Sequence, residues 1–171
     1  MAIKKKTVTE NEARLKMADL CARSEQCEFD INQKLFRLGL YTDQRERIIS
    51  FLKEERFIDH QRFARSFARD KCRFSGWGPF KIRQGLSLKR IPSSLISEAL
   101  DEIEEEEWND ALDKAARSKE KGLDLIGERA KENRIKLYKF LLSRGFENDS
   151  VKEKVKQMVI KQKRENEGMD S

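Results

Sequence analysis

Four arginines recur at helical spacing in the middle of the chain: Arg62, Arg65, Arg69 and Arg73. On a helix that advances about 100° per residue, they fall within an arc of about 80°. Phe and Ala residues form an apolar stripe on the opposite side, as in an amphipathic helix. Guanidinium groups in a row can hold phosphates or carboxylates. An ordinary solvated face is the alternative, but it would favour mixed charges over arginine alone.

We therefore expect a partner-binding or nucleic-acid-binding surface at these arginines, helped by four nearby cations: Lys81, Arg83, Lys89 and Arg90. Residues 61–97 hold nine cations and one acid, whereas residues 98–113 hold nine acids and no cation. Such asymmetry is typical of a protein with a charged partner. The acidic run 104–107 has three explanations: it imitates nucleic acid, it pairs with the arginine face, or it is a solvated helix end.

Two aromatic residues, Trp77 and Phe80, alternate with cations in the same stretch. Aromatic side chains among cations can stack on nucleic-acid bases. These two, however, flank Gly78 and Pro79, which predict a turn and a helix start. The position therefore favours core packing that fixes the turn.

Motifs for catalysis or metal binding are missing from the sequence. The only histidine is His60, and the cysteines are Cys21, Cys27 and Cys72, with no CxxC pair. A zinc site needs about four ligands at short spacings, and no common nucleophile or phosphate-loop motif is present. We expect a protein that is not an enzyme, has no metal or cofactor, and keeps its thiols reduced.

The composition predicts an all-α protein. Charged residues make up 40% of the 171 residues, against roughly 25% in an average globular protein. There are only 8 Gly and 2 Pro, and Lys, Arg, Glu and Leu favour helix. No apolar run approaches the ~20 residues of a membrane span, and the basic N-terminus has no apolar signal-peptide region after it. We expect a cytoplasmic monomer that does not contact membranes.

An internal repeat organises the apolar residues. When Gly39, Arg90 and Gly145 are aligned as anchors, 51 and 55 residues apart, five apolar positions match in three copies. The matched sets are Ile31/Ile82/Leu137, Leu35/Leu86/Leu141, Leu40/Ile91/Phe146, Ile49/Leu100/Val155 and Leu52/Ile103/Met158. Such a period predicts stacked helical units. We expect three tandem three-helix repeats, stacked into an elongated, curved array.

The predicted helices lie near 10–24, 26–38 and 42–55, near 59–74, 78–89 and 92–105, and near 108–121, 130–143 and 148–163. The corresponding domain bounds are a flexible N-terminus 1–9, repeats 10–57, 58–106 and 107–163, and a flexible tail 164–171. Local signals support several ends: a Thr7/Glu10 capping box, an Asp59 N-cap, and Gly39 and Gly145 just after helices.

The middle of the chain resembles the RecX family of recombinase regulators. Residues 57–71 (FIDHQRFARSFARDK) are similar to that family's aromatic/Ile-Asp-acidic-x-Arg-aromatic-Ala-x-x-Phe segment. The resemblance continues through Trp77-Gly78 to Ala99-Leu100, and residues 20–39 and 141–146 match the flanking repeats. His60 stands where the family often has an acid, and Cys27 stands at an N-cap where serine is usual.

The resemblance implies an all-α regulator, not an enzyme, that lies in the groove of the RecA recombinase filament. It implies inhibition of RecA ATP hydrolysis and strand exchange, and hence control of homologous recombination, DNA repair and the SOS response. Two other classes stay open. One is a helical-repeat protein that binds single- or double-stranded DNA directly through the basic middle repeat. The other is a helical adaptor for a different acidic protein.

Overall fold

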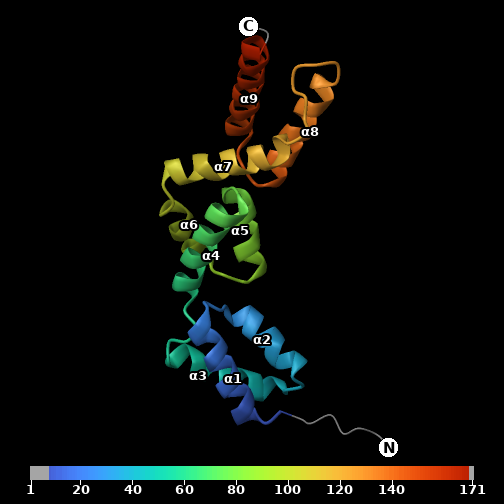
Figure 1. Ribbon diagram of the computed structural model, residues 1–171. Helices are drawn as coiled ribbons and strands as arrows, with labels where there is room; N and C mark the ends of the chain where they lie inside the picture. Colours follow the sequence, from blue (N-terminus) through green and yellow to red (C-terminus); the bar gives the residue numbers. More distant parts are fainter. Residues whose placement is uncertain (1–7, 170–171) are drawn as a thin grey trace, which may run out of the picture. The chain divides into compact units, whose positions relative to one another are not determined.

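The computed structural model describes residues 8–169, and every regular element within that range is a helix (Figure 1). The all-α class is therefore confirmed. The helices are α1 Glu10–Arg23, α2 Glu28–Arg37, α3 Thr42–Glu54, α4 His60–Ser75, α5 Pro79–Leu88, α6 Ser93–Asp101, α7 Glu105–Glu120, α8 Ala130–Ser143 and α9 Asn148–Met169. They follow the nine predicted helices closely, because apolar residues at helical spacing and turn residues between them agree on the same boundaries.

The helices divide into two compact units. The first comprises the described residues up to Ser66 together with Leu86–Ile96, and the second comprises Phe67–Gly85 and the described residues from Ser97 onward. The boundary therefore falls within α4, α5 and α6. The predicted repeat bounds 10–57, 58–106 and 107–163 follow helix triplets rather than compact units, and they stay a prediction.

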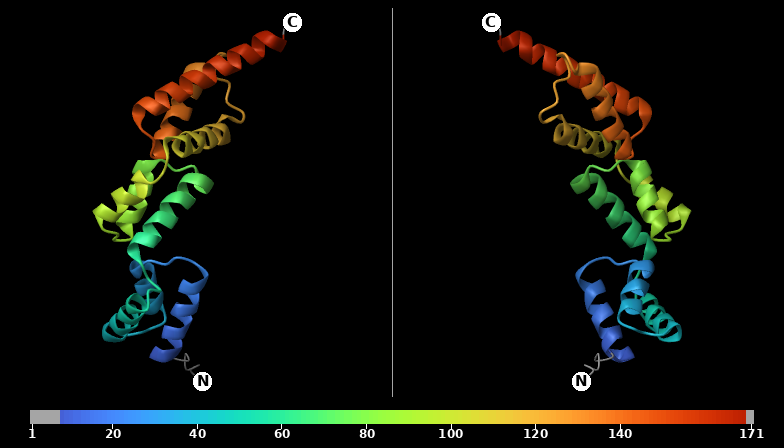
Figure 2. Two further views of the ribbon diagram at one scale, coloured as in Figure 1. Left: turned by 90° about the vertical axis from the view of Figure 1, so that its left-hand side faces the viewer. Right: turned by 90° about the vertical axis from the view of Figure 1, so that its right-hand side faces the viewer.

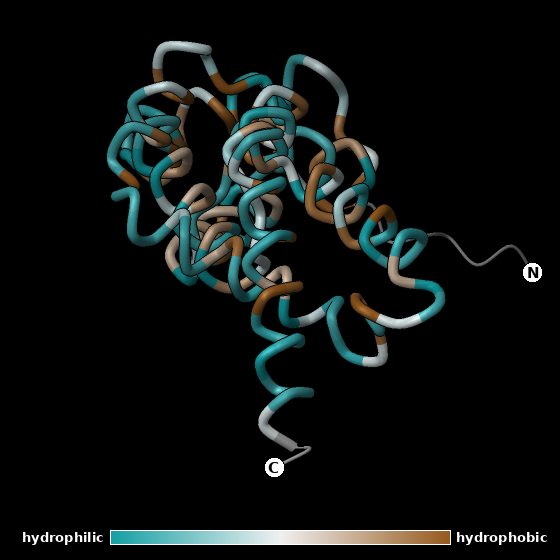
Figure 3. The backbone as a smooth tube through the Cα atoms, turned by 90° about the horizontal axis from the view of Figure 1, so that it is seen from above, coloured by the Kyte–Doolittle hydropathy of each residue, from teal (hydrophilic) through white to brown (hydrophobic). Residues whose placement is uncertain are grey.

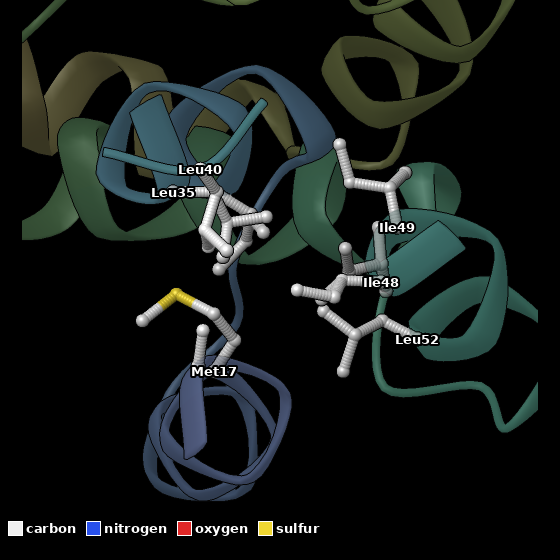
Figure 4. Close-up of a cluster of buried hydrophobic side chains, with 9 residues drawn as sticks. Met17, Leu35, Leu40, Ile48, Ile49 and Leu52 are labelled. Atoms are coloured by element: carbon white, nitrogen blue, oxygen red, sulfur yellow. The ribbon is translucent and has the colours of Figure 1, made fainter. Parts of the chain in front are cut away.

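The core of the first unit forms where α1, α2 and α3 face one another. Met17 of α1, Leu35 of α2 and Ile48 of α3 are almost completely buried in it. Figure 4 shows Met17, Leu35, Leu40 and the α3 side chains pointing into one shared space. Burying a side chain of this size stabilises a fold by about 1.5–3 kcal/mol, so this cluster holds the three helices together.

The second unit contains α7, α8 and α9, which pack against one another in all three pairings; Figure 2 shows α9 in red beside α8. The buried face of α7 carries alanines, including Ala111 and Ala115, which let a neighbouring helix approach closely. Leu125, in the connection between α7 and α8, is fully buried. Its amide donates to the Gln162 side chain at 2.9 Å, and its carbonyl accepts from Arg134 at 2.7 Å, so side chains of α8 and α9 fix the connection.

The internal repeat is confirmed by burial. Its matched apolar residues are buried in all three copies, with the single exception of Val155, which is partly exposed. Hydrophobic residues recur singly along the helices rather than in long runs (Figure 3). In the described part of the chain, no helix has the length and apolar character needed to cross a membrane.

The three anchors of the repeat share one backbone conformation. Gly39, Arg90 and Gly145 have φ of +85°, +59° and +88°, the left-handed region that ends many helices. After the first two anchors, the amides of Leu40 and Ile91 donate back to the carbonyls of Leu35 and Leu86 at 3.3 and 3.2 Å. The anchors are therefore the points where α2, α5 and α8 end and the chain turns.

The predicted capping box is wrong, and the last helix ends later than predicted. The capping box uses Thr9 and Glu12 instead of Thr7 and Glu10. The flexibility expected over 1–9 stays a prediction. Residues 1–7 lie outside the described part, as do 170 and 171. The tail expected over 164–171 is helical as far as Met169, because good helix formers fill it and Lys161 pairs with Glu165 one turn away.

Leu86 tests the repeat register. It is fully buried, whereas Leu88, two positions along α5, is 70% exposed. We expect Leu86→Ala to lower the free energy of unfolding by about 2–5 kcal/mol, because it leaves a cavity. Leu88→Ala is the matched control and should change it by no more than about 0.5 kcal/mol. Urea unfolding measures both; equal effects would contradict the alignment on Arg90.

Candidate partner-binding surface

The helix that carries the arginine row starts as the sequence predicts. Asp59 caps α4, since its Oδ1 accepts a hydrogen bond of 2.9 Å from the amide of Arg62. This bond holds the pKa of Asp59 below its usual value. Ile58 before the cap and Phe63 in the first turn are both buried, as a hydrophobic staple requires. The cap thereby fixes the residue at which α4 starts, and with it the side of the helix on which its arginines lie.

In the first unit, Arg62 is held by acceptors of the same unit. Its Nε donates to Glu25 Oε1 at 2.5 Å, and its Nη2 donates to the Arg56 carbonyl at 3.0 Å. About half of the Arg62 side chain stays exposed. Arg65, one turn further along α4, is partly buried.

In the second unit, the two remaining arginines of the row face carboxylates. Arg69 Nη2 lies 3.5 Å from Glu102, and Arg73 Nε donates to Glu107 at 2.7 Å. The bond from Arg73 lowers the pKa of Glu107. Of the three explanations for the acidic run 104–107, pairing with the arginine face is the one observed for Glu107.

In the arginine row, Arg62, Arg69 and Arg73 therefore form half-exposed ion pairs. Arg69 and Arg73 keep 48% and 57% of their side-chain surface exposed while they contact these acids. An exposed pair of this kind contributes about 0.2–1 kcal/mol. A helical wheel of α4 alone does not show which acids pair with the arginines, because these acids lie more than 30 residues away in sequence. The guanidinium groups of Arg62, Arg69 and Arg73 stay accessible, and only a weak interaction opposes their exchange to another acid or phosphate.

The four helper cations have partners too. In the first unit, Lys89 lies 2.5 Å from Asp30, and the Arg90 guanidinium lies over the Phe29 ring at 5.3 Å. In the second unit, the Lys81 ammonium lies over the Trp77 ring at 4.9 Å and donates to the Ser143 carbonyl, and Arg83 donates to Ser97 at 3.4 Å. Lys81 and Lys89 thus help to join helices, whereas the Arg83 bond is long and exposed.

The two aromatic residues behave differently. Trp77 packs edge-to-face with Phe67, with ring centroids 6.3 Å apart, and Lys71 lies over its ring at 5.0 Å. Packing is thus its role, as expected. For Phe80 the expectation of core packing is wrong, because 56% of the residue is exposed. The hydrogen bond of its amide to Gly145, at 3.1 Å, anchors the backbone and leaves the ring outside.

The start of α5 meets the end of α8 through backbone groups, a junction that sequence reasoning missed. The amide of Gly78 donates to the Arg144 carbonyl at 2.7 Å, next to the bond between Phe80 and Gly145. A Cβ on Gly78 would lie 2.5 Å from the Gly145 carbonyl oxygen, and a Cβ on Gly145 would collide with Lys81. The positive end of one helix dipole thereby meets the negative end of the other, and glycine is required at both positions.

The first unit contains a junction at the equivalent positions of the repeat. With Gly39 and Arg90 aligned, Phe29 corresponds to Phe80 and Asp30 to Lys81. Phe29 and Asp30 contact Arg90 and Lys89 at the end of α5, as described above. The junction in the first unit therefore uses side chains where the junction in the second unit uses backbone hydrogen bonds.

The cysteines are free thiols, as expected: Cys27 and Cys72 are buried and Cys21 is partly exposed. Burial raises the pKa of Cys72 to about 11, so this thiol is a poor nucleophile at neutral pH. Within residues 8–169, no group of three or more His, Cys, Asp or Glu side chains is arranged to hold a metal ion.

Comparison with known proteins identifies the family. Residues 59–100, which include α4, α5 and all but the last residue of α6, match the second three-helix domain of RecX. Regulatory protein RecX of Vibrio parahaemolyticus is 31% identical over 134 residues, which cover 77% of this chain and 82% of that protein. The chain belongs to the RecX family.

Further RecX proteins agree with this assignment. Regulatory protein RecX of Clostridium botulinum (strain Eklund 17B) is 31% identical over 80% of this chain, which spans 64% of that protein's length. A crystal structure of regulatory protein RecX matches 86% of this chain and 71% of its own with a TM-score of 0.71 and 28% identity. RecX from Lactobacillus salivarius shares the fold, with a TM-score of 0.67 and 20% identity. The tandem three-helix repeat is thus a RecX architecture.

The junction of the second unit gives a stability prediction for this RecX chain. We expect Gly78→Ala to lower the free energy of unfolding by about 1–3 kcal/mol, because the added methyl group collides with the Gly145 backbone. Gly168→Ala, in α9 with no atom near the new methyl group, is the control and should be neutral or slightly stabilising. Urea unfolding measures both variants. A Gly78→Ala protein as stable as the wild type would show that the junction is loose.

Proposed function

We propose that this chain binds the RecA recombinase filament and inhibits its ATPase and strand-exchange activities. In this role it regulates recombination, DNA repair and the SOS response, acting in the cytoplasm as a monomer. The observation that carries the proposal is the match to regulatory RecX proteins along about four fifths of the chain. The chain acts by binding and performs no chemistry of its own.

The arginine row is the surface that we assign to the filament. Each of its ion pairs with known geometry is half-exposed and contributes little to stability. Acidic or phosphate groups of a partner can therefore replace the internal acids at small cost, and complementary charge speeds the encounter. The residues that we assign to it are Arg62 and Arg65, supported by Lys89 and Arg90, in the first unit, and Arg69 and Arg73, supported by Lys81 and Arg83, in the second.

Direct nucleic-acid binding is the second candidate, and one observation favours it. Phe80 and Phe74 are 56% and 73% exposed, although both belong to the most basic stretch of the chain. Exposed aromatic rings among cations can stack on unpaired bases. Affinity of this kind would fall steeply with salt and need no recombinase.

RecA activity on single-stranded DNA tests the proposal. We expect the purified chain to slow ATP hydrolysis by RecA filaments at concentrations well below that of RecA, because one bound regulator blocks a filament of many subunits. Binding of the chain to the same DNA without RecA is measured in parallel at low and high salt. Strong salt-sensitive DNA binding with no effect on RecA beyond DNA competition would favour the second candidate instead.

A charge swap separates the internal role of Arg73 from a role in binding. Arg73→Glu alone places two carboxylates together, whereas Arg73→Glu with Glu107→Arg rebuilds the pair in reverse. We expect the double variant to regain the wild-type melting temperature but to inhibit RecA about tenfold less, because α4 has lost a cation that faces the filament.

The control for this swap is Lys163→Glu, an exposed cation near the end of α9, which should leave inhibition unchanged. If the double variant regains both stability and inhibition, Arg73 serves only its pair with Glu107, and the filament surface lies elsewhere.

A further inference from the structure

The first unit contains an apolar groove between α1 and α2, with a volume of about 460 Å³. This lies within the range of about 300–1,000 Å³ that is usual for ligand pockets. The floor is formed by Met17, Leu20 and Leu38. Met17, which Figure 4 shows pointing toward Leu35 and Leu40, belongs to the core, so the groove opens directly onto it.

Cations surround this apolar floor on both sides. Lys16 and Arg23 stand on α1, and Lys34 and Arg37 stand on α2. The only carboxylate in the lining is Asp19, which already pairs with Arg23 at 2.5 Å. The groove therefore presents an apolar centre inside a strongly positive rim.

The repeat shows what the equivalent groove holds in the second unit. When the first two repeats are aligned at their offset of 51 residues, Lys16 corresponds to Phe67 and Gln26 to Trp77. The rings of Phe67 and Trp77 pack together there, and a Cβ on Gly85 would lie 3.0 Å from Phe67. Two aromatic rings thus occupy the space that the first unit leaves to Lys16 and Gln26.

Gln26 does not close the groove of the first unit. Its side chain turns to local partners, with its amide donating to Ser24 Oγ at 2.8 Å and its Oε1 accepting from Lys34 at 3.4 Å. Lys16 is exposed and carries its charge at the rim. The first unit thus keeps the groove but lacks the two aromatic rings, Phe67 and Trp77, that pack together at the equivalent positions in the second unit.

We propose that this groove binds an acidic, amphipathic protein segment that inserts a bulky apolar side chain between α1 and α2 and pairs its carboxylates with the rim. The apolar floor needs an apolar side chain, which a phosphate backbone does not supply. The chain's own residues 1–7 are a poor occupant, because Lys4, Lys5 and Lys6 carry the same charge as the rim. The groove spans about 10 Å of α1, or two helical turns, which suits a short helix.

The proposal is independent of the arginine row and of RecA. The test uses the full chain and a fluorescein-labelled 12-residue peptide with Trp and Leu at i and i+4 and mostly Glu elsewhere. We expect saturable binding by fluorescence anisotropy, weakened but not abolished by high salt. A peptide with Ser at the Trp and Leu positions, and one with Lys for Glu, should each bind at least about tenfold more weakly.

Two variants test whether the peptide binds in the groove. Gln26→Trp introduces the aromatic ring that Trp77 supplies at the equivalent position of the second unit, without changing charge. We expect it to weaken binding at least about tenfold. Lys16→Glu with Arg37→Glu changes only exposed side chains, so it tests the rim even if Gln26→Trp fails to fold. Arg14→Glu is the matched control on α1, since Arg14 is exposed and does not line the groove, and it should leave binding unchanged.

Four outcomes would overturn the proposal. The first is wild-type affinity in both groove variants, and the second is equal binding of the Ser-substituted peptide, which would indicate charge attraction alone. The third is a dimer in light scattering that Gln26→Trp dissociates, which would make a second copy the occupant. The fourth is oligothymidine binding that the groove variants abolish while they leave peptide binding intact. None of these bears on RecA inhibition, which is measured separately.

Discussion

The contact between the start of α5 and the end of α8 constrains the second unit more than any single side chain does. Amides that α5 cannot satisfy within itself donate to carbonyls at the end of α8. This contact requires the two backbones to touch, so Gly78 and Gly145 leave no room for a Cβ. Because the hydrogen bonds fix both the distance and the direction of approach, the positions of Lys81 and the Trp77 turn follow from them.

The equivalent junction in the first unit shows how one repeat can be held together by different chemistry. In the repeat alignment, Cys27 corresponds to Gly78, and Arg90 corresponds to Gly145. Arg90 adopts φ of +59°, a conformation that costs a non-glycine residue about 1–3 kcal/mol. Its guanidinium lies over Phe29, and the neighbouring Lys89 pairs with Asp30. These side-chain contacts offset the backbone cost that glycine avoids at the other two anchors.

The features that sequence predicted were those encoded locally. Apolar spacing and turn residues located all nine described helices, and the alignment of the anchors located buried residues such as Leu35, Leu86 and Leu141. The capping box was misplaced because Thr7/Glu10 and Thr9/Glu12 fit the same sequence pattern, and the structure forms the second. The partners of Arg62 and Arg73 were unpredictable in detail, since they lie more than 30 residues away.

The same comparison explains why equivalent repeats need not have equivalent roles. In the second unit, Phe67 and Trp77 fill the space between α4 and α5, so the cations there lie on a closed surface. In the first unit, lysine and glutamine at those positions leave an apolar groove with a charged rim. Filling the groove would add apolar burial and stabilise the fold, as it does in the second unit. An open groove therefore costs stability, and the cations around it fit the acidic partner that we propose for it.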